Sequence, residues 1–100
     1  MEYEIVWTER ALNSLEEVHA YLAQFNPAAA DRIIREILDR VQLLATVPLM
    51  GAMYPRGSQG PFRVVVSGKC RIFYRIINES RRVDVLLVWH GYRQEPDLPG

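Results

Sequence analysis

The sequence has little cysteine and no long hydrophobic run. Cys70 is the sole cysteine among 100 residues, which excludes an internal disulfide and a thiolate cluster for zinc. The longest apolar stretch, residues 83–89, is interrupted by Asp84 and falls far short of the roughly 20 residues that span a bilayer. The two histidines lack a metal-binding spacing, and no glycine-rich phosphate loop precedes a helix. We therefore expect no metal ion, no other cofactor and no membrane partner.

The N-terminal residues also lack the basic region of a secretory signal. Met1-Glu2-Tyr3-Glu4 has two acids in that place, so we expect a cytoplasmic protein. The length, the 49% hydrophobic composition and the absence of a linker-like tract predict one domain over residues 1–100. Residues 94–100 contain two acids and two prolines and are predicted to form a flexible tail.

What the chain does have is an uneven distribution of charge. Residues 1–55 hold four basic and eight acidic side chains, whereas residues 56–93 hold eight basic and two acidic ones, although the whole chain is formally neutral. The basic residues lie among three predicted strands, so a sheet face offers a docking surface for a polyanion or an acidic partner segment. They are Arg56, Arg63, Lys69, Arg71, Arg75, Arg81, Arg82 and Arg93.

Two amphipathic helices are predicted in the first half of the chain. Apolar residues recur at three- and four-residue steps over residues 9–24 and 27–45. Thr8 suits the cap of the first helix, and Asn26 followed by Pro27 suits the start of the second. The predicted core stripes are Ala11, Leu12, Leu15, Val18, Leu22 and Phe25 on the first helix, and Ala30, Ile33, Ile34, Ile37, Leu38, Val41 and Leu44 on the second.

Strands are predicted before and after the helices. Alternation indicates strands over residues 3–7, 62–67, 71–77 and 83–89, while residues 48–61 predict an irregular connection. In the last strand, Val83, Val85, Leu87 and Trp89 are expected on one face. The order strand, helix, helix, strand, strand, strand predicts an α+β fold. We expect an antiparallel helical hairpin to pack on a mainly antiparallel sheet.

Several short motifs occur in order along nearly the whole chain. They are Ile5-Val6-Trp7-Thr8-Glu9-Arg10-Ala11, Asn26-Pro27-Ala28-Ala29-Ala30, Pro48 with Gly51, Phe62-Arg63-Val64-Val65-Val66-Ser67-Gly68, Arg71-Ile72-Phe73-Tyr74-Arg75 and Val88-Trp89-His90-Gly91-Tyr92-Arg93. With the element order, they resemble the RelE/ParE superfamily of toxins from bacterial type II toxin–antitoxin modules. The resemblance implies a toxin that a cognate antitoxin protein holds inactive, with operator DNA contacted only through the antitoxin.

The superfamily has two activities, so the resemblance leaves the target open. RelE-like members cleave messenger RNA in the ribosomal A site, and ParE-like members poison DNA gyrase. The Trp-His-Gly-Tyr-Arg ending and the Asn-Pro-Ala-Ala-Ala helix start resemble ParE more than RelE. We therefore predict a plasmid-stabilisation type of toxin that inhibits DNA gyrase. The alternatives are a ribosome-dependent mRNA endonuclease and an inactive binding module of the same fold.

If the protein cleaves RNA, its predicted catalytic set is Arg63, Arg71, His90 and Arg93. The three arginines match basic positions of RelE-like surfaces, and guanidinium groups suit phosphate oxygens. Because arginine is a poor general base, proton transfer falls to His90, whose ordinary pKa is near 6.5. This mechanism needs no metal. Arg75 and Tyr92 are further candidate contacts to a target or substrate.

Other observations argue against RNA cleavage. Pro61 stands where RelE-like members have a lysine, the tyrosine beyond Arg93 is absent, and the sequence pI of about 6.7 is low for a ribosome-binding protein. His90 has a structural alternative, packing beside Trp89.

The sequence also leaves several surface interactions open. Arg71 and Arg75 can instead pair with helix carboxylates such as Glu36 or Asp39. His19 has no acid–base partner apparent in the sequence and is expected at the surface or on the flank of its helix. An antitoxin strand is expected to add to one edge of the sheet, either at residues 3–7 or at residues 62–67.

Overall fold

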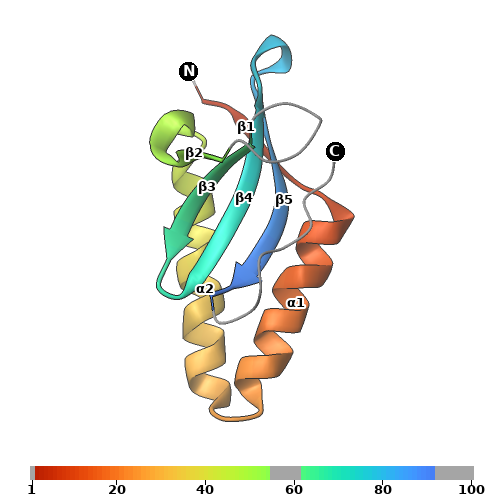
Figure 1. Cartoon of the computed structure of the whole chain (residues 1–100), viewed down its shortest axis with the longest axis vertical. Coiled ribbons are helices and arrows are strands. Elements are labelled where there is room, and N and C mark those ends of the chain that lie inside the picture. The colour runs from red at the N-terminus through yellow and green to blue at the C-terminus, as the bar shows by residue number, and fades with distance from the viewer. Residues whose placement is uncertain (1, 55–61, 92–100) are drawn as a thin grey trace.

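The computed structural model describes residues 2–54 and 62–91. Two helices lie side by side and cover one face of a five-stranded sheet (Figure 1), so the predicted α+β fold is confirmed. Short 3-10 turns at Pro48–Met50 and Asn78–Ser80 link some of the elements. In chain order the elements are β1 (Glu4–Trp7), α1 (Glu9–Ala23), α2 (Pro27–Leu43), β2 (Ala52–Tyr54), β3 (Phe62–Ser67), β4 (Cys70–Ile77) and β5 (Arg82–His90).

The sheet has the strand order β1-β5-β4-β3-β2. β1 runs parallel to β5, and the other neighbours are antiparallel, as the short connections between the last three strands predict. β2 was not predicted, because three residues are too few for an alternating pattern to be visible in sequence. The rest of the predicted irregular connection, residues 55–61, and the predicted tail, residues 94–100, lie outside the described residues.

The helices begin at the predicted capping residues. Thr8 Oγ1 accepts a hydrogen bond from the Ala11 backbone N–H at 3.1 Å, and Asn26 Oδ1 accepts one from Ala29 N–H at 3.0 Å. Pro27 occupies the start of α2, where its missing N–H removes no helical hydrogen bond. No helix within residues 2–54 and 62–91 has both the length and the apolar character needed to cross a membrane.

The core lies between the helices and the sheet. It combines Ala11, Val18, Ile37, Val41 and Leu44 of the helical region with Ile72, Tyr74, Val83, Val85 and Val88 of the strands. Three members of the predicted helix stripes are instead exposed, namely Leu12 at 46%, Phe25 at 72% and Leu38 at 43%. The hairpin end of the two helices extends past the strand ends (Figure 1), which explains the exposure of Phe25.

A β-bulge changes which residues of β5 face the helices. Phe73 pairs with Leu87 but its neighbour Tyr74 pairs with Val85, so Leu86 is an extra residue in β5. Val83, Val85 and Val88 consequently all belong to the core. The prediction that Val83, Val85 and Leu87 share one face is therefore wrong beyond the bulge, because one inserted residue reverses the alternation.

Candidate functional site

The structure places Arg63 and Arg71 on opposite faces of the sheet. Arg63 is the cross-strand partner of Tyr74, which belongs to the core, so it lies on the helix side. Its Nη1 donates a hydrogen bond to the Gly51 carbonyl oxygen at 2.8 Å. Arg71 precedes the core residue Ile72, and its guanidinium carbon lies 5.7 Å from the centre of the Phe73 ring. Neighbouring residues of a strand point to opposite faces, so Arg71 faces away from the helices.

His90 lies on the helix side but at the other end of β4. It pairs with Cys70, is 8% exposed, and its ring centre is 5.7 Å from that of Tyr21. Cys70 is four residues along β4 from Tyr74, the partner of Arg63, which is about 13 Å at about 3.3 Å per residue. The described members of the predicted catalytic set therefore do not converge. Tyr92 and Arg93 lie outside the described residues, and the set as a whole stays a prediction.

Asp84 contacts two of the basic residues on the sheet face away from the helices. Arg82 donates from Nε to Asp84 Oδ1 at 2.7 Å, and Arg75 Nη2 lies 3.6 Å from Oδ2. The hydrogen bond and the charge of Asp84 raise the pKa of Arg82. The suggested pairing of Arg75 with a helix carboxylate is wrong, because β4 directs Arg75 away from the helices. Asp84 is buried, so its charge would be left poorly compensated if these arginines were removed.

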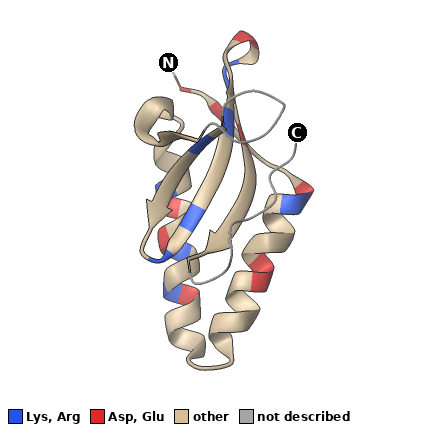
Figure 2. Cartoon of the chain, in the orientation of Figure 1, with Lys and Arg blue, Asp and Glu red and all other residues tan. Residues whose placement is uncertain are grey.

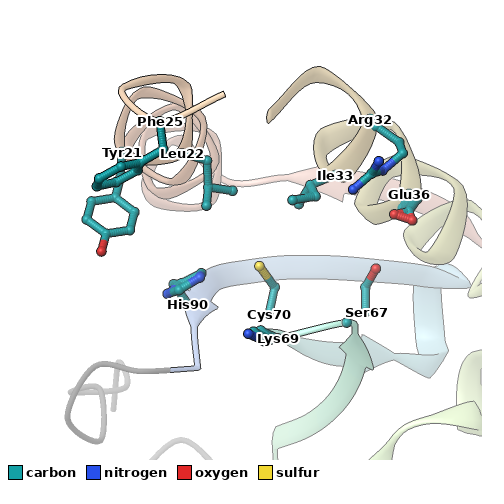
Figure 3. A pocket seen from close by; sticks show the side chains of 11 residues that line it. Tyr21, Leu22, Phe25, Arg32, Ile33, Glu36, Ser67, Lys69, Cys70 and His90 are labelled. Carbon is teal, nitrogen blue, oxygen red and sulfur yellow. The ribbon is translucent and has the colours of Figure 1, made fainter. Parts of the chain in front are cut away.

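A cavity of about 510 Å³ opens between the hairpin end of the helices and the turn from β3 to β4 (Figure 3). Tyr21, Leu22 and Phe25 of the α1 end, with Ile33 of α2, form an apolar wall, and Cys70 and His90 lie opposite them. Burial raises the pKa of the Cys70 thiol, which keeps it protonated and a poor nucleophile at neutral pH. This arrangement suits the binding of an apolar group better than catalysis.

The sequence pattern did not reveal this cavity because it placed Phe25 in the core stripe of the first helix. The available signal was the position of Phe25 immediately before Asn26-Pro27, where the first helix ends. An apolar residue at the end of a helix can lie beyond the edge of the sheet and so remain exposed.

One edge of the sheet is only partly covered. β2 pairs with β3 from Phe62 to Val64, and residues 65–67 have no strand partner among the described residues on that side. Val66 in this segment is 55% exposed. A second groove, of about 400 Å³, lies beside the segment and is lined by Glu36, Asp39, Arg40, Leu43, Ser67 and Gly68. Of the two predicted edges, β1 is terminal in the sheet, and β3 is open over its second half.

Comparison with known proteins identifies the family. A family model described as the ParE toxin of the type II toxin–antitoxin system parDE matches residues 5–95. The chain belongs to the ParE toxin family. It is also 36% identical over 95 residues to the Sinorhizobium fredii protein Y4kP, which is named as a candidate toxin, and the match covers 94% of each chain.

Solved structures share the fold of this ParE-family toxin. The toxin–antitoxin complex RelBE2 from Mycobacterium tuberculosis matches with a TM-score of 0.69 and 24% identity, over 90% of this chain and 99% of that one. The chromosomal ParDE system from P. aeruginosa matches with a TM-score of 0.71 and 20% identity, over 89% and 96%. The RelE–RelB complex from Pyrococcus horikoshii matches with 0.65 and 15%, over 93% and 99%.

Charged side chains of the ParE-family toxin differ between its two layers. Figure 2 shows basic residues along β3 and β4, whereas the helices carry both signs. One side-chain contact joins the two helices at the surface: His19 Nε2 of α1 lies 2.7 Å from Asp31 Oδ1 of α2. The sequence showed no partner for His19, because this contact joins residues from different helices.

Proposed function

We propose that this ParE-family toxin arrests bacterial growth by inhibiting DNA gyrase and that a cognate antitoxin neutralises it. The observation that carries the proposal is the family match over residues 5–95, which is to ParE. The Trp-His-Gly-Tyr-Arg motif at residues 89–93 also resembles ParE more than RelE, which agrees with this target.

The arrangement of the basic residues supports the gyrase target over RNA cleavage. Cleavage by transesterification needs cations and a proton-transfer group around one phosphate. In the described structure, Arg63 and Arg71 lie on opposite sheet faces, and Arg63 already bonds the Gly51 carbonyl. His90 is buried against Tyr21 at the other end of β4. These positions disfavour a shared site for Arg63, Arg71 and His90.

A ribosome-dependent mRNA endonuclease is the second candidate. Two of the matching solved structures are RelB–RelE or RelBE2 complexes, and their likeness extends over at least 90% of this chain. Because these relatives are under 25% identical, they support the fold and leave the target to experiment.

The antitoxin part of the proposal is supported by the open edge of β3. Residues 65–67 offer backbone groups to an added strand, and the exposed Val66 offers an apolar contact. The matching solved structure from M. tuberculosis is a toxin–antitoxin complex, and the one from P. horikoshii is a RelE–RelB complex. An acidic antitoxin segment would complement the basic strands. Its affinity should fall with rising salt, and an affinity that ionic strength leaves unchanged would remove the electrostatic part of the proposal.

The deciding experiment is to induce the protein alone in a bacterial host while DNA supercoiling and translation are followed in parallel. Early loss of supercoiling with continuing translation is the expected result. Immediate translation arrest with cut ribosome-bound messages would instead support the endonuclease, and absence of any growth arrest would support an inactive module. Co-expression of a cognate antitoxin should restore growth.

Two variants add a control for the chemistry. Arg71→Ala and His90→Ala should leave gyrase inhibition within a few-fold of the parent protein when both variants fold. If RNA cleavage is the activity, removing a group that stabilises the transition state should lower the rate by roughly 10²–10³. Circular dichroism of both purified variants checks that the fold is retained.

A further inference from the structure

The two edges of the sheet differ in charge. β1 forms one edge and β2 the other, and no strand among residues 2–54 and 62–91 lies on the outer side of either. Glu4 in β1 and the preceding Glu2 are exposed, and such charges keep the strand edges of neighbouring molecules apart. Residues 41–54, which end with β2, contain no charged side chain, although charged residues make up 24% of the chain. The β2 edge therefore lacks this protection.

Apolar side chains are also exposed along this uncharged segment. Leu43 is 49% exposed, Val47 50%, Leu49 67% and Met53 53%. Backbone hydrogen bonds hold the segment before β2 compact: Val47 N–H donates to the Leu43 carbonyl oxygen at 2.9 Å, and Met50 N–H donates to that of Val47 at 3.1 Å. Together the four exposed side chains offer roughly 400 Å², an area typical of an interaction site on a small protein.

The three residues of β2 are complementary to a second copy of themselves. β2 comprises Ala52, Met53 and Tyr54, and successive residues of a strand direct their N–H and C=O groups to opposite sides, so some of these groups point to the open edge. In an antiparallel pair with two-fold symmetry, the residue at the axis lies opposite its own copy. Only an axis at Met53 pairs all three residues, with Ala52 of one copy opposite Tyr54 of the other.

The side chains of β2 suit this register. Met53 lies on the helix side because it pairs with Arg63, and a methionine opposite a methionine forms an adaptable apolar contact. Ala52 and Tyr54 lie on the other face, where a small residue opposite a large one avoids a clash. The Tyr54 ring packs edge-to-face on Phe73 with ring centres 5.1 Å apart, so little conformational entropy is lost when a partner covers it.

We propose that the β2 edge is a dimer interface of this toxin, in which two copies pair antiparallel through β2 about a two-fold axis at Met53. The two five-stranded sheets then form one continuous sheet. Because α2 packs over β3 on the helix side, the axis also brings the exposed Leu43 and Val47 of the two copies toward each other. The interface does not use residues 65–67 of β3, and the proposal depends on neither an antitoxin nor gyrase.

A second copy fits this edge better than a charged partner segment does. Uncharged strands meet their own copies without repulsion, whereas an acidic segment would find no cation within residues 41–54. Arg63 lies one strand further in, and its guanidinium donates to the Gly51 carbonyl oxygen. The backbones of the two Arg63 copies would be three strand spacings apart, about 14 Å, where salt screens their repulsion.

The size of the surface predicts a weak, reversible dimer. The exposed side chains of two copies supply roughly 800 Å² and the β2 backbones add to it, which places the interface at the low end of specific ones. We therefore expect a micromolar dissociation constant. Sedimentation velocity of the purified toxin from about 1 µM to about 300 µM should show a shift from monomer to dimer. A monomer at every concentration, or growth beyond the dimer, would overturn the proposal.

Charge substitutions at the axis test the symmetry. Met53→Lys puts like charges opposite each other and should weaken dimerisation at least about 10-fold. Leu12→Lys is the matched control: Leu12 is 46% exposed on α1, outside residues 41–54, and the same change there should alter dimerisation less than about 2-fold. Mixing the Met53→Lys and Met53→Glu variants should restore association, because the axis places this residue opposite its own copy. Equal effects of the two lysine variants, or a mixture that associates no better than its components, would contradict the interface.

A disulfide tests the register. Residues directly opposite in an antiparallel pair have Cα atoms about 4.5 Å or about 5.5 Å apart, within the span of a disulfide. Met53→Cys should therefore cross-link two copies on mild oxidation, with the native Cys70 retained because it is buried. Leu12→Cys should not cross-link, and equal cross-linking of both variants would refute the register. Since Met53 and Leu12 are exposed, all these variants should fold, and thermal unfolding provides the check.

Discussion

The phenol of Tyr74 fixes the backbone of Gly51 beside the centre of the sheet. Tyr74 Oη accepts a hydrogen bond from Gly51 N–H at 2.9 Å and donates one to the Pro48 carbonyl oxygen at 2.7 Å. Arg63 bonds the carbonyl oxygen of the same glycine. These contacts position the turn that leads into β2. They thereby determine how much of β3 is covered and how much remains open for a partner.

Tyr74→Phe should lower the free energy of unfolding by about 1–3 kcal/mol, because it leaves the buried Gly51 N–H without its acceptor. Urea denaturation monitored by tryptophan fluorescence provides the measurement. Tyr3→Phe is the control, since the Tyr3 hydroxyl makes an exposed hydrogen bond to Asn78. An equally large loss in both variants would show that the buried position of the Tyr74 bond has no special effect.

Gly51→Ala should be strongly destabilising for a steric reason. An added Cβ would lie 2.6 Å from Tyr74 Oη and 2.7 Å from the Val64 carbonyl oxygen, so the turn or the strand has to move. Gly68→Asn is the comparison: Gly68 has φ +58° but no atom within 4 Å of a Cβ, and asparagine tolerates that backbone conformation. We expect a clearly lower melting temperature for Gly51→Ala than for Gly68→Asn. The reverse order would contradict the packing described around Gly51.

Ser14→Ala should also reduce stability. Ser14 Oγ accepts a hydrogen bond from Val88 N–H at 2.9 Å and donates to the Ala11 carbonyl oxygen at 2.8 Å. The serine of α1 thus satisfies a backbone group of β5 that lies beyond the part paired with β1. Its loss should cost about 1–3 kcal/mol in denaturant unfolding, whereas the exposed Ser80→Ala should change stability by less than about 0.5 kcal/mol. Comparable values for the two serines would refute this role.

Stability should fall in alkaline solution. Burial raises the pKa of Cys70 above its ordinary 9.0 and that of Tyr74 above 10.0, the second effect being reduced by the Gly51 hydrogen bond and by Arg63. The unfolded chain then releases these protons at lower pH than the folded protein does. Their contribution is complete below about pH 9 and is lost as the pH rises through the raised values.

The measurement for this pH effect is urea denaturation at several pH values from 7 to about 11. The unfolding free energy should decrease less steeply in the double variant Cys70→Ala/Tyr74→Phe than in the parent protein, although the variant starts from a lower stability at neutral pH. Identical slopes for the two proteins would assign the alkaline effect to other groups.

Local sequence patterns predicted most of the elements because the interactions that start them are local. Thr8 and Asn26 cap the helices through residues three positions ahead, and these contacts are visible in the sequence alone. Strand β2 was missed because its stability comes from pairing with β3, ten residues later in the chain. The bulge at Leu86 was missed for the same kind of reason, since register between β4 and β5 is a tertiary property.

The sequence by itself determined the fold class, the helix starts and the division of charge, because periodicity, capping and composition are local properties. Only the tertiary structure decided where the candidate site residues lie. Strand pairing put Arg63 and Arg71 on opposite faces, and the projection of the helical hairpin past the sheet exposed Phe25. Faces and exposure depend on strand register and on the relative lengths of the layers, which arise only when distant segments pack together.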